Sequence, residues 1–263
     1  MTDQHPSLTY SSYLALDDVL AAQHPRSDEH DELLFIVIHQ VYELWFKQML
    51  HELTGLQDRL GAGDTPRALQ TLGRVRAILK VAVAQVDVLE TMTPRQFSSF
   101  RDRLDASSGF QSEQFRELEA TLGRRDRRVF EHYPAGSPGR ERIAAAMSRP
   151  SVFDSFLRYL TTQGYDVPAA ALDRDLTTPW EPSEDVQDLL LRAYADEGGA
   201  AQVAERLVDL DEGLQEWRYR HVKMVERTIG AKMGTGGSSG ATYLWSTVTH
   251  QLFPDLWAIR SRM

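Results

Sequence analysis

An all-helical fold is predicted by two features of the sequence. Apolar residues recur at helical spacing almost throughout, and they do not alternate with polar residues as they do in strands. Short polar or glycine-containing gaps separate these periodic runs. With 263 residues, of which 42% are hydrophobic, the chain is long enough to bury a substantial core. We expect residues 1–263 to form a single helical domain.

The first long helix is expected over residues 31–60. Its apolar residues cover nearly the whole circumference, and a helix that is apolar on all sides is expected to be buried. These residues are Leu33, Leu34, Phe35, Ile36, Val37, Ile38, Val41, Leu44, Trp45, Met49, Leu50 and Leu53.

The other helices follow in order along the chain. A second helix is expected over residues 67–89. Thr93 and Pro94 supply an N-cap and a first-turn proline for a third, so we expect three antiparallel neighbours. Later helices are expected over residues 111–122, 151–163 (ending at Gly164), 183–197, 200–229 and 242–253, and loops over residues 133–139 and 178–182. The helix over residues 200–229 would be about 45 Å long and would cross the whole domain.

The composition excludes several classes of function. The chain has 29 basic and 38 acidic residues, a net charge of −9, which disfavours nucleic acid and anionic membranes as partners. The absence of cysteine excludes disulfides, iron–sulfur clusters and thiolate-ligated haem, so a bound metal must use histidine, carboxylate or weaker ligands. No apolar stretch is long enough to span a bilayer, and residues 1–7 lack the order of a signal peptide. We expect a cytoplasmic protein.

His39 is the first candidate for a functional role. It lies within the apolar helix, with Phe35, Tyr42 and Phe46 on the same face. The pattern is typical of a core histidine bonded to a carbonyl, and it also fits a ligand or a catalytic group. Glu43, four residues further on, would add a carboxylate, as in a non-haem metal site, but no second histidine motif completes such a site.

His221 is the second candidate, in the middle of the last long helix. Trp217 lies four residues before it, and Arg218, Arg220 and Lys223 flank it. These cations would suit haem propionates beside an axial imidazole. The same pattern is typical of a core histidine beside a solvated, charged face.

Two further segments carry polar groups of interest. The glycine-rich residues 230–240 lack the Gly-Lys-Ser/Thr of a phosphate-binding loop and follow a helix, which disfavours nucleotide binding. Their composition suits either a lid, with Thr235 offering a hydroxyl, or a flexible connector. Arg101, four residues after Phe97, suits a carboxylate clamp, although such an arginine is more often a surface residue.

Five ordered segments resemble the tryptophan 2,3-dioxygenase family over nearly the whole chain. They are residues 8–14 (LTYSSYL), 31–47 (DELLFIVIHQVYELWFK), 100–112, 217–221 (WRYRH) and 234–240 (GTGGSSG). The resemblance implies a homotetrameric, haem b-dependent enzyme in which the helical domain encloses the haem. The implied reaction inserts both atoms of O2 across the indole C2–C3 bond of L-tryptophan and gives N-formyl-L-kynurenine, the first step of the kynurenine route.

The resemblance also implies roles for individual residues. His221 would be the proximal ligand of the haem iron, and His39 the distal catalytic histidine facing the indole N–H. Arg101 would pair with the substrate carboxylate, and Thr235 in the active-site loop 230–241 would bond the head group. The other implied contacts are Phe35 and Phe97 with the substrate, Ser108 and Gly109 with the cofactor, and Tyr10, Tyr13 and Leu14 of the exchanged segment 1–20 with the substrate of a neighbouring subunit. Some family members carry tyrosine where this chain has Phe97.

Three alternatives stay open at this point. A related haem-dependent oxygenase would act on a modified tryptophan or insert only one oxygen atom. A non-haem metal oxygenase would use His39 and Glu43. A non-catalytic helical interaction protein would bind no cofactor.

Overall fold

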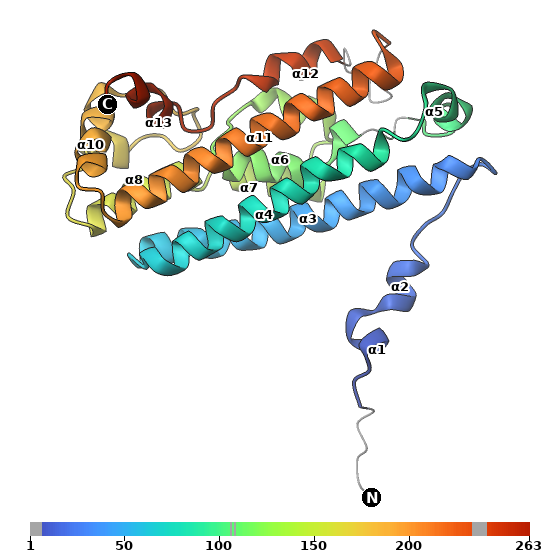
Figure 1. The fold of residues 1–263 in the computed structure, drawn as a ribbon, viewed down its shortest axis with the longest axis horizontal. Coiled ribbons are helices and arrows are strands. Elements are labelled where there is room, and N and C mark those ends of the chain that lie inside the picture. The colour runs from blue at the N-terminus through green and yellow to red at the C-terminus, as the bar shows by residue number, and fades with distance from the viewer. Residues whose placement is uncertain (1–6, 106, 108, 233–240) are drawn as a thin grey trace, which may run out of the picture.

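The structure, a computed structural model, describes residues 7–105, 107, 109–232 and 241–263. Within these residues every regular element is a helix, which confirms the predicted all-helical class. Three long helices, α3 (His30–Gly61), α4 (Thr65–Leu89) and α11 (Gly199–Ile229), run side by side along the longest axis of the molecule (Figure 1). The shorter helices cover one face of this layer and both of its ends.

A tight turn makes α3 and α4 antiparallel neighbours. Gly63 has a φ of +69°, a left-handed conformation that glycine adopts without strain. The side chain of Asp64 then accepts a hydrogen bond from the backbone N–H of Arg67, and Pro66 occupies the first turn of α4. The chain therefore reverses within a few residues, and both helices begin and end within two residues of the predicted bounds.

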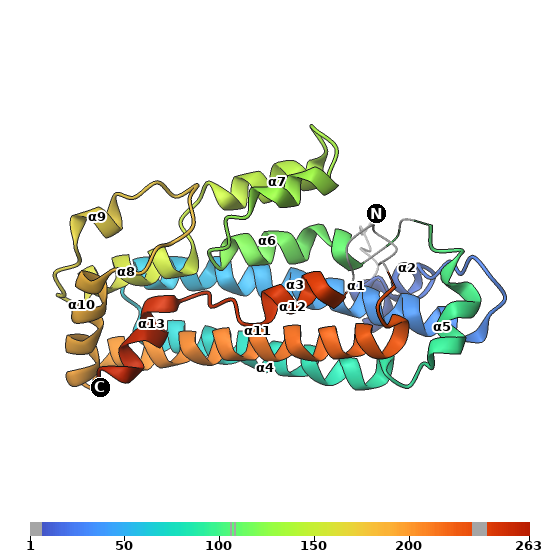
Figure 2. The same cartoon turned by 90° about the horizontal axis from the view of Figure 1, so that it is seen from above.

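The main neighbours of α4 are α3 and α11. A Cβ atom at Gly213 would lie 2.9 Å from Leu79 Cδ2, so the missing side chain lets α11 approach α4 closely. α11 has 31 residues and crosses the whole molecule, as predicted (Figure 2). The predicted third antiparallel neighbour is wrong: α5 (Pro94–Arg101) has the expected Thr93 N-cap, but it has only eight residues and caps one end of the bundle.

A second layer covers α3. It consists of α6 (Glu113–Thr121) and α8 (Val152–Thr162), which pack on α3, and α7 (Pro138–Met147), which packs on α6 (Figure 2). A capping box between Ser151 and Asp154 begins α8, and Gly164 with a φ of +91° follows its end, as the sequence predicts. Short 3₁₀ helices, η1 (Gly109–Gln111) and η2 (Arg127–His132), flank α6. The largest fully buried side chains include Tyr159, Phe153, Phe156, Phe253, Met49, Leu53, Leu56 and Leu60.

The opposite end of the bundle from α5 contains the C-terminus, and we call it the α10 half. It is built from α8, α9 (Ala169–Leu172), α10 (Glu184–Ala195), α13 (Pro254–Ala258) and η3 (Ile259–Ser261). α10 begins after its N-cap Ser183, where the sequence predicts the start of a helix, with Glu184 and Asp185 in its first turn. Residues 178–182 form the predicted loop.

α3 is not buried on all sides, contrary to the prediction. Leu33, Val37 and Leu44 are 48%, 38% and 56% exposed. The helices that pack on α3 cover only part of its circumference, so this apolar stripe faces away from the rest of the chain.

Two other predicted boundaries are wrong. The helix expected over residues 242–253 ends at Val248, as α12 (Ala241–Val248), and α13 begins only at Pro254. Between them, the N–H groups of Leu252 and Phe253 donate to the buried Asp211 carboxylate instead of continuing the helix. The loop expected over residues 133–139 ends at Ser137, whose side chain caps α7, and Pro138 fits the first turn of that helix. The sequence did not predict α7 or α9.

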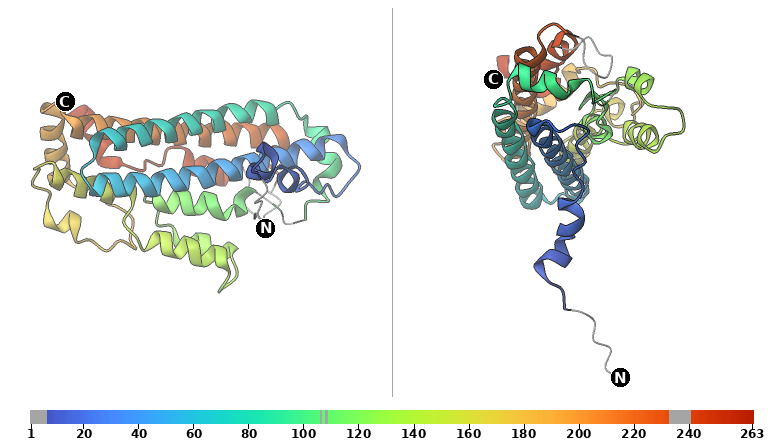
Figure 3. Two further views of the ribbon diagram at one scale, coloured as in Figure 1. Left: turned by 90° about the horizontal axis from the view of Figure 1, so that it is seen from below. Right: turned by 90° about the vertical axis from the view of Figure 1, so that its right-hand side faces the viewer.

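Two short helices precede the bundle and project away from it. They are α1 (Tyr10–Leu14) and α2 (Leu16–Leu20), and the right-hand view of Figure 3 shows this arm pointing away from the long helices. Leu8, Tyr10 and Tyr13 are each more than 70% exposed. No helix in the described part of the chain is both long enough and apolar enough to cross a membrane.

Candidate active site

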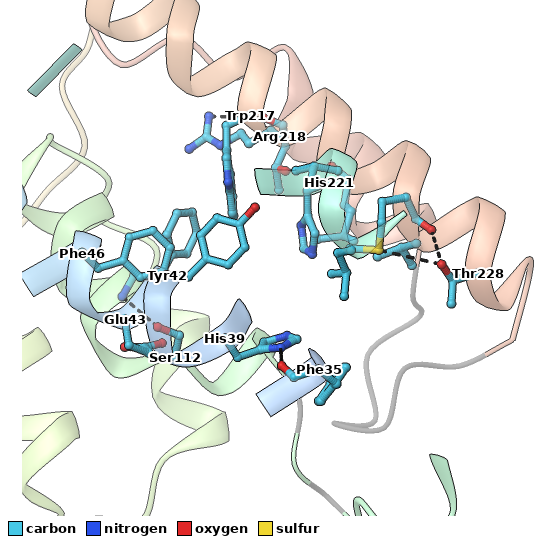
Figure 4. A pocket seen from close by; sticks show the side chains of 18 of the residues that line it. Phe35, His39, Tyr42, Glu43, Phe46, Ser112, Trp217, Arg218, His221 and Thr228 are labelled. Atoms are coloured by element: carbon cyan, nitrogen blue, oxygen red, sulfur yellow. Dashed lines mark hydrogen bonds between the residues drawn. The ribbon is translucent and has the colours of Figure 1, made fainter. Parts of the chain in front are cut away.

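A cavity lies between α3 and α11 in the half of the bundle that α5 caps, and we call this the cavity half. α4, α5, α6 and α12 complete its walls (Figure 4). Six of the residues to which the family resemblance gives a role line it: Phe35, His39, Phe97, Arg101, Gly109 and His221. Ser108 and Thr235 lie outside the described residues. The structure therefore brings together side chains from four separate segments of the chain.

The tautomer of His39 follows from the hydrogen bond at its Nδ1 atom. Nδ1 lies 2.7 Å from the carbonyl oxygen of Phe35, and because a carbonyl only accepts, Nδ1 carries the proton. Burial lowers the pKa of His39, although the Phe35 carbonyl and the Glu43 carboxylate oppose this effect. The imidazole is therefore neutral near pH 7, and Nε2 keeps a lone pair. A Cβ atom on Gly109 would lie 3.8 Å from Nε2, so the glycine leaves room beside this nitrogen.

Aromatic rings form an apolar wall beside His39. The ring centroids of Phe35 and His39 are 4.1 Å apart, and those of Phe35 and Phe97 are 5.7 Å apart. Phe100 is fully buried behind both phenylalanines and contacts each of them. This wall suits a flat aromatic ligand, because ring edges and faces can pack against it.

His221 faces the cavity from the opposite side, on α11 (Figure 4). The indole of Trp217 stacks on its imidazole with 5.1 Å between the ring centroids and 23° between the ring planes. Tyr42, Phe46 and Phe115 pack around Trp217. No hydrogen bond to the His221 imidazole is found among the described residues. Burial, with His39 and Arg116 nearby, lowers the pKa of His221 to about 4, so the ring is neutral near pH 7 and a nitrogen lone pair is available.

A buried charged cluster forms one end of the cavity. Glu119 of α6 is 3% exposed, and it accepts hydrogen bonds from Arg116 at 2.6 Å, Arg124 at 2.7 Å and Arg218 at 3.1 Å. Burial raises the pKa of a carboxyl group, but the three guanidinium groups outweigh it and lower the pKa of Glu119 to about 2. We call these four residues the Glu119 cluster. Asp126 also pairs with Arg124, and the three cations still outnumber these two carboxylates at the cavity wall.

Arg101 reaches the cavity from the last residue of α5. Phe97 lines the cavity one turn earlier on the same helix, as the spacing of four residues predicts. The short α5 thus presents a guanidinium and an aromatic ring to the same cavity, on the side where Phe35 and His39 lie.

Two of the cations predicted beside His221 lie elsewhere. Arg220 pairs with Asp87 and Glu90 of α4, and Lys223 pairs with Glu226 on the outer face of α11. Neither lines the cavity, since they project from other faces of the helix; of the three flanking cations only Arg218 reaches it. The prediction of a propionate site from Arg220 and Lys223 is therefore wrong.

Other predicted residues are also away from the cavity or engaged. Tyr10, Tyr13 and Leu14 lie on the projecting arm and line no part of the cavity of their own chain. Glu43 lines the cavity, but its carboxylate accepts a hydrogen bond from Gln114 at 2.8 Å. No group of three potential metal-ligating side chains occurs in the described part of the chain, which leaves the non-haem site of His39 and Glu43 without a third ligand.

Sequence reasoning missed most of the cavity wall. Arg116 and Glu119 are three residues apart on a helix, which is equally typical of a solvated surface pair. Tyr243, Leu244 and Thr247 of α12 also line the cavity, but nothing local in the sequence places α12 at the cavity wall. The aromatic character of Trp217, Tyr42 and their neighbours was the only local signal for the surroundings of His221.

The donor set of the cavity fits a haem group. Two neutral imidazoles face the cavity from opposite walls, and the chain offers no cysteine as an alternative ligand. The Glu119 cluster supplies guanidinium groups for anionic substituents at one edge, and aromatic side chains supply apolar walls.

Comparisons with known proteins agree with this site. The family model described as "Tryptophan 2,3-dioxygenase" matches residues 2–136 and 188–263. A protein named tryptophan 2,3-dioxygenase from Anaeromyxobacter dehalogenans is 66% identical over 258 residues, which cover 98% of this chain and 97% of the relative. Proteins of the same name from Herpetosiphon aurantiacus and Caulobacter vibrioides are 56% and 44% identical, and each match covers 97% of this chain and 98% of the relative. With the matched segments spanning both histidine-bearing helices, the chain belongs to the tryptophan 2,3-dioxygenase family.

Proposed function

We propose that the chain catalyses the reaction of L-tryptophan with O2 to give N-formyl-L-kynurenine, and that it does so with haem b bound between His221 and His39. The observation that carries the proposal is the pair of neutral imidazoles on opposite walls of one cavity, with a cationic cluster at its edge. The names of the relatives support the substrate and the reaction class. When bound, haem supplies the redox chemistry that activates O2.

His221 is the proposed iron ligand. A neutral imidazole can donate a nitrogen lone pair to iron, and the lowered pKa keeps His221 neutral well below pH 7. Stacking on Trp217 restrains rotation of the ring, so the lone pair keeps its direction. The Glu119 cluster is the proposed site of the haem propionates, because carboxylates pair strongly with guanidinium groups.

His39 is the proposed partner of the substrate indole. With Nδ1 donating to the Phe35 carbonyl, Nε2 accepts the hydrogen bond of the indole N–H. This contact orients the indole ring against Phe35 and Phe97. Gly109 leaves the space beside Nε2 that the indole needs. His39 acts in this scheme by orientation and is not assigned as an obligatory base.

Arg101 is the proposed clamp for the substrate carboxylate. A bidentate contact fixes the amino acid end, while His39 fixes the indole end, so the C2–C3 bond is held in one orientation. Holding a reactant in this way can lower a barrier by several kcal/mol. Thr235 and Ser108, which lie outside the described residues, are proposed contacts with the head group and the cofactor.

The proposed assembly is a homotetramer with exchanged N-terminal segments. The arm that carries Tyr10, Tyr13 and Leu14 projects from its own bundle, and its exposed apolar side chains suit a neighbouring subunit. The exposed stripe of Leu33 and Val37 on α3 is a further apolar surface available to such a contact.

The test is the mass of the product formed by haem-reconstituted, reduced protein with L-tryptophan under ¹⁸O2. We expect one product that contains two labelled oxygen atoms and has the near-ultraviolet absorption of N-formylkynurenine. One labelled atom would assign the chain to the alternative that inserts a single oxygen. Haem uptake without any product from L-tryptophan, and with product from a substituted tryptophan, would change the proposed substrate.

A further inference from the structure

α12 forms one wall of the cavity although little apolar burial holds it. It has eight residues, and of these only Ala241 and Thr247 are buried. Its inner face presents Tyr243, Leu244 and Thr247 to the cavity, and its main neighbour is α11. A short helix with so few buried apolar contacts has low local stability, so polar contacts must contribute much of what fixes its position.

The outer face of α12 makes a set of contacts that the proposed chemistry does not use. The Trp245 indole N–H donates to Glu226 Oε1 at 2.5 Å, and Lys223 Nζ lies 5.2 Å from the centroid of the Trp245 ring. The ring of Tyr219 meets the same indole edge to face, with 5.9 Å between centroids. Lys223 also pairs with Glu226 at 2.9 Å. Tyr219, Lys223 and Glu226 follow one another along a single face of α11, and with Trp245 they form what we call the Trp245 clasp.

The inner face of α12 is linked to the Glu119 cluster. Arg124 donates to the Tyr243 hydroxyl at 3.4 Å, and Arg218 donates to the carbonyl oxygens of Thr247 at 3.3 Å and His250 at 3.0 Å. Tyr243 and Arg124 line both the main cavity and a second cavity beyond the cluster. α12 therefore lies between the clasp outside and the cationic cluster inside.

We propose that Trp245 is a positioning residue for the cofactor: the Trp245 clasp holds α12 against α11 so that Tyr243 stays beside Arg124 and closes the cationic edge of the cavity. This inference rests on the proposed haem function. If the clasp opens, the fraction of molecules with α12 in place falls, and the haem is lost in proportion because its binding site is complete in that fraction only.

The structure offers a matched control in the α10 half. Trp180 donates its indole N–H to Asp255 at 2.5 Å, and Arg174 lies 5.4 Å from its ring centroid. Trp180 thus combines the same two kinds of contact, a carboxylate acceptor and a cation over the ring, far from the cavity. Its removal costs stability without touching α12.

The test measures the rate at which haem transfers from the reconstituted holoprotein to excess apomyoglobin. We expect Trp245→Phe, which keeps the ring contacts and loses the hydrogen bond to Glu226, to raise this rate about threefold. Trp245→Ala, which also loses the cation–π contact, should raise it about tenfold, since each of these two contacts is worth a factor of about three. Trp180→Ala should leave the rate of haem transfer unchanged, even if it lowers the melting temperature as much as Trp245→Ala does. Equal rates for the Trp245→Ala and wild-type proteins, or equal acceleration by Trp180→Ala, would overturn the inference.

A double-mutant cycle tests whether Trp245 acts through Tyr243. If it does, the Trp245→Ala/Tyr243→Phe protein releases haem no faster than the faster single variant, because both changes disrupt the same arrangement. If the two substitutions multiply each other's effect on the rate of haem transfer, Trp245 does not act through Tyr243. A wild-type chain that takes up no haem would refute the proposed function and the inference together, whereas a wild-type holoprotein whose haem is insensitive to Trp245 would refute the inference alone.

Discussion

Two buried sites at opposite ends of the bundle hold carboxylates in different ways. In the α10 half, Asp211 accepts hydrogen bonds from Leu252 N, Phe253 N and the Trp257 indole at 2.8, 3.1 and 2.9 Å. Asp255 accepts from the Trp180 indole and from Ser183 N and the Gln187 amide in the same way. All these donors are neutral, and both carboxylates are fully buried.

In the cavity half, three guanidinium groups surround the single carboxylate of Glu119. Neutral donors satisfy the hydrogen-bonding capacity of a carboxylate and leave its negative charge in place. A carboxylate bound in this way joins the chain segments that supply the donors. Three guanidinium groups exceed what one carboxylate needs, and the excess charge lies at a cavity wall. The difference indicates that the Asp211 and Asp255 sites serve stability and that the Glu119 cluster is also suited to receive an anionic ligand.

The largest expected effect on stability comes from Glu119→Gln. This change leaves three buried guanidinium groups without their shared counter-charge, and we expect the free energy of unfolding of the haem-free protein to fall by about 3–5 kcal/mol. Urea unfolding measures it. The control is Asp126→Asn, which alters a partly exposed partner of Arg124 and should cost less than about 1 kcal/mol. Similar losses in the free energy of unfolding for both variants would contradict the special role of the Glu119 cluster.

Acidification should weaken the same cluster. The pKa of Glu119 is about 2 in the folded chain against an ordinary value of 4.5, so its contribution to stability is present above pH 4.5 and is lost as the pH falls toward 2. A shift of this size corresponds to about 3 kcal/mol. Unfolding curves at several pH values should show the difference between wild-type and Glu119→Gln proteins shrinking over this interval. If the difference in the free energy of unfolding does not change with pH, ionisation of Glu119 does not contribute to stability in this way.

Arg101→Gln should weaken substrate binding. We expect the KM for L-tryptophan to rise about 30-fold, as loss of a charge-assisted contact of about 2 kcal/mol predicts. Arg103→Gln, at an exposed position two residues later, is the matched control and should leave the KM unchanged. An unchanged KM in the Arg101 variant would remove this residue from the proposed carboxylate clamp.

Asp211→Asn is expected to have the smallest effect of this series. The amide keeps one oxygen acceptor for the neutral donors, so the free energy of unfolding should fall by only about 1–2 kcal/mol. Haem content should stay at the wild-type level, because Asp211 contacts the segment before α13 and not the cavity. Loss of haem in this variant would contradict the proposed difference between the Asp211 site and the Glu119 cluster.

Sequence reasoning predicted the long helices well because their signals are local. The Thr93 cap and the apolar periodicity of α3, α4 and α11 depend on neighbouring residues only. The break between α12 and α13 was missed because it depends on Asp211, some forty residues earlier in the chain. Long-range contacts of this kind leave no trace in local periodicity.

The candidate site was predictable to different degrees. Local patterns around His39 and His221 left a core role and a ligand role both open, and only the family resemblance favoured the second. The cavity brings both residues together, which supports that reading. The flanking cations of α11 were a misleading signal: Arg220 and Lys223 lie on other faces of the helix, and the cationic edge comes instead from Arg116, Arg124 and Arg218.

The central claim is that His221 holds the cofactor while His39 serves the substrate. Titration of haem into wild-type, His221→Ala and His39→Ala proteins, followed by the Soret band, tests this most directly. We predict one haem per chain in the wild-type and His39→Ala proteins, with much lower turnover in the latter, and no stable haem in a folded His221→Ala protein. A His221→Ala protein that retains haem with the wild-type spectrum would contradict the account.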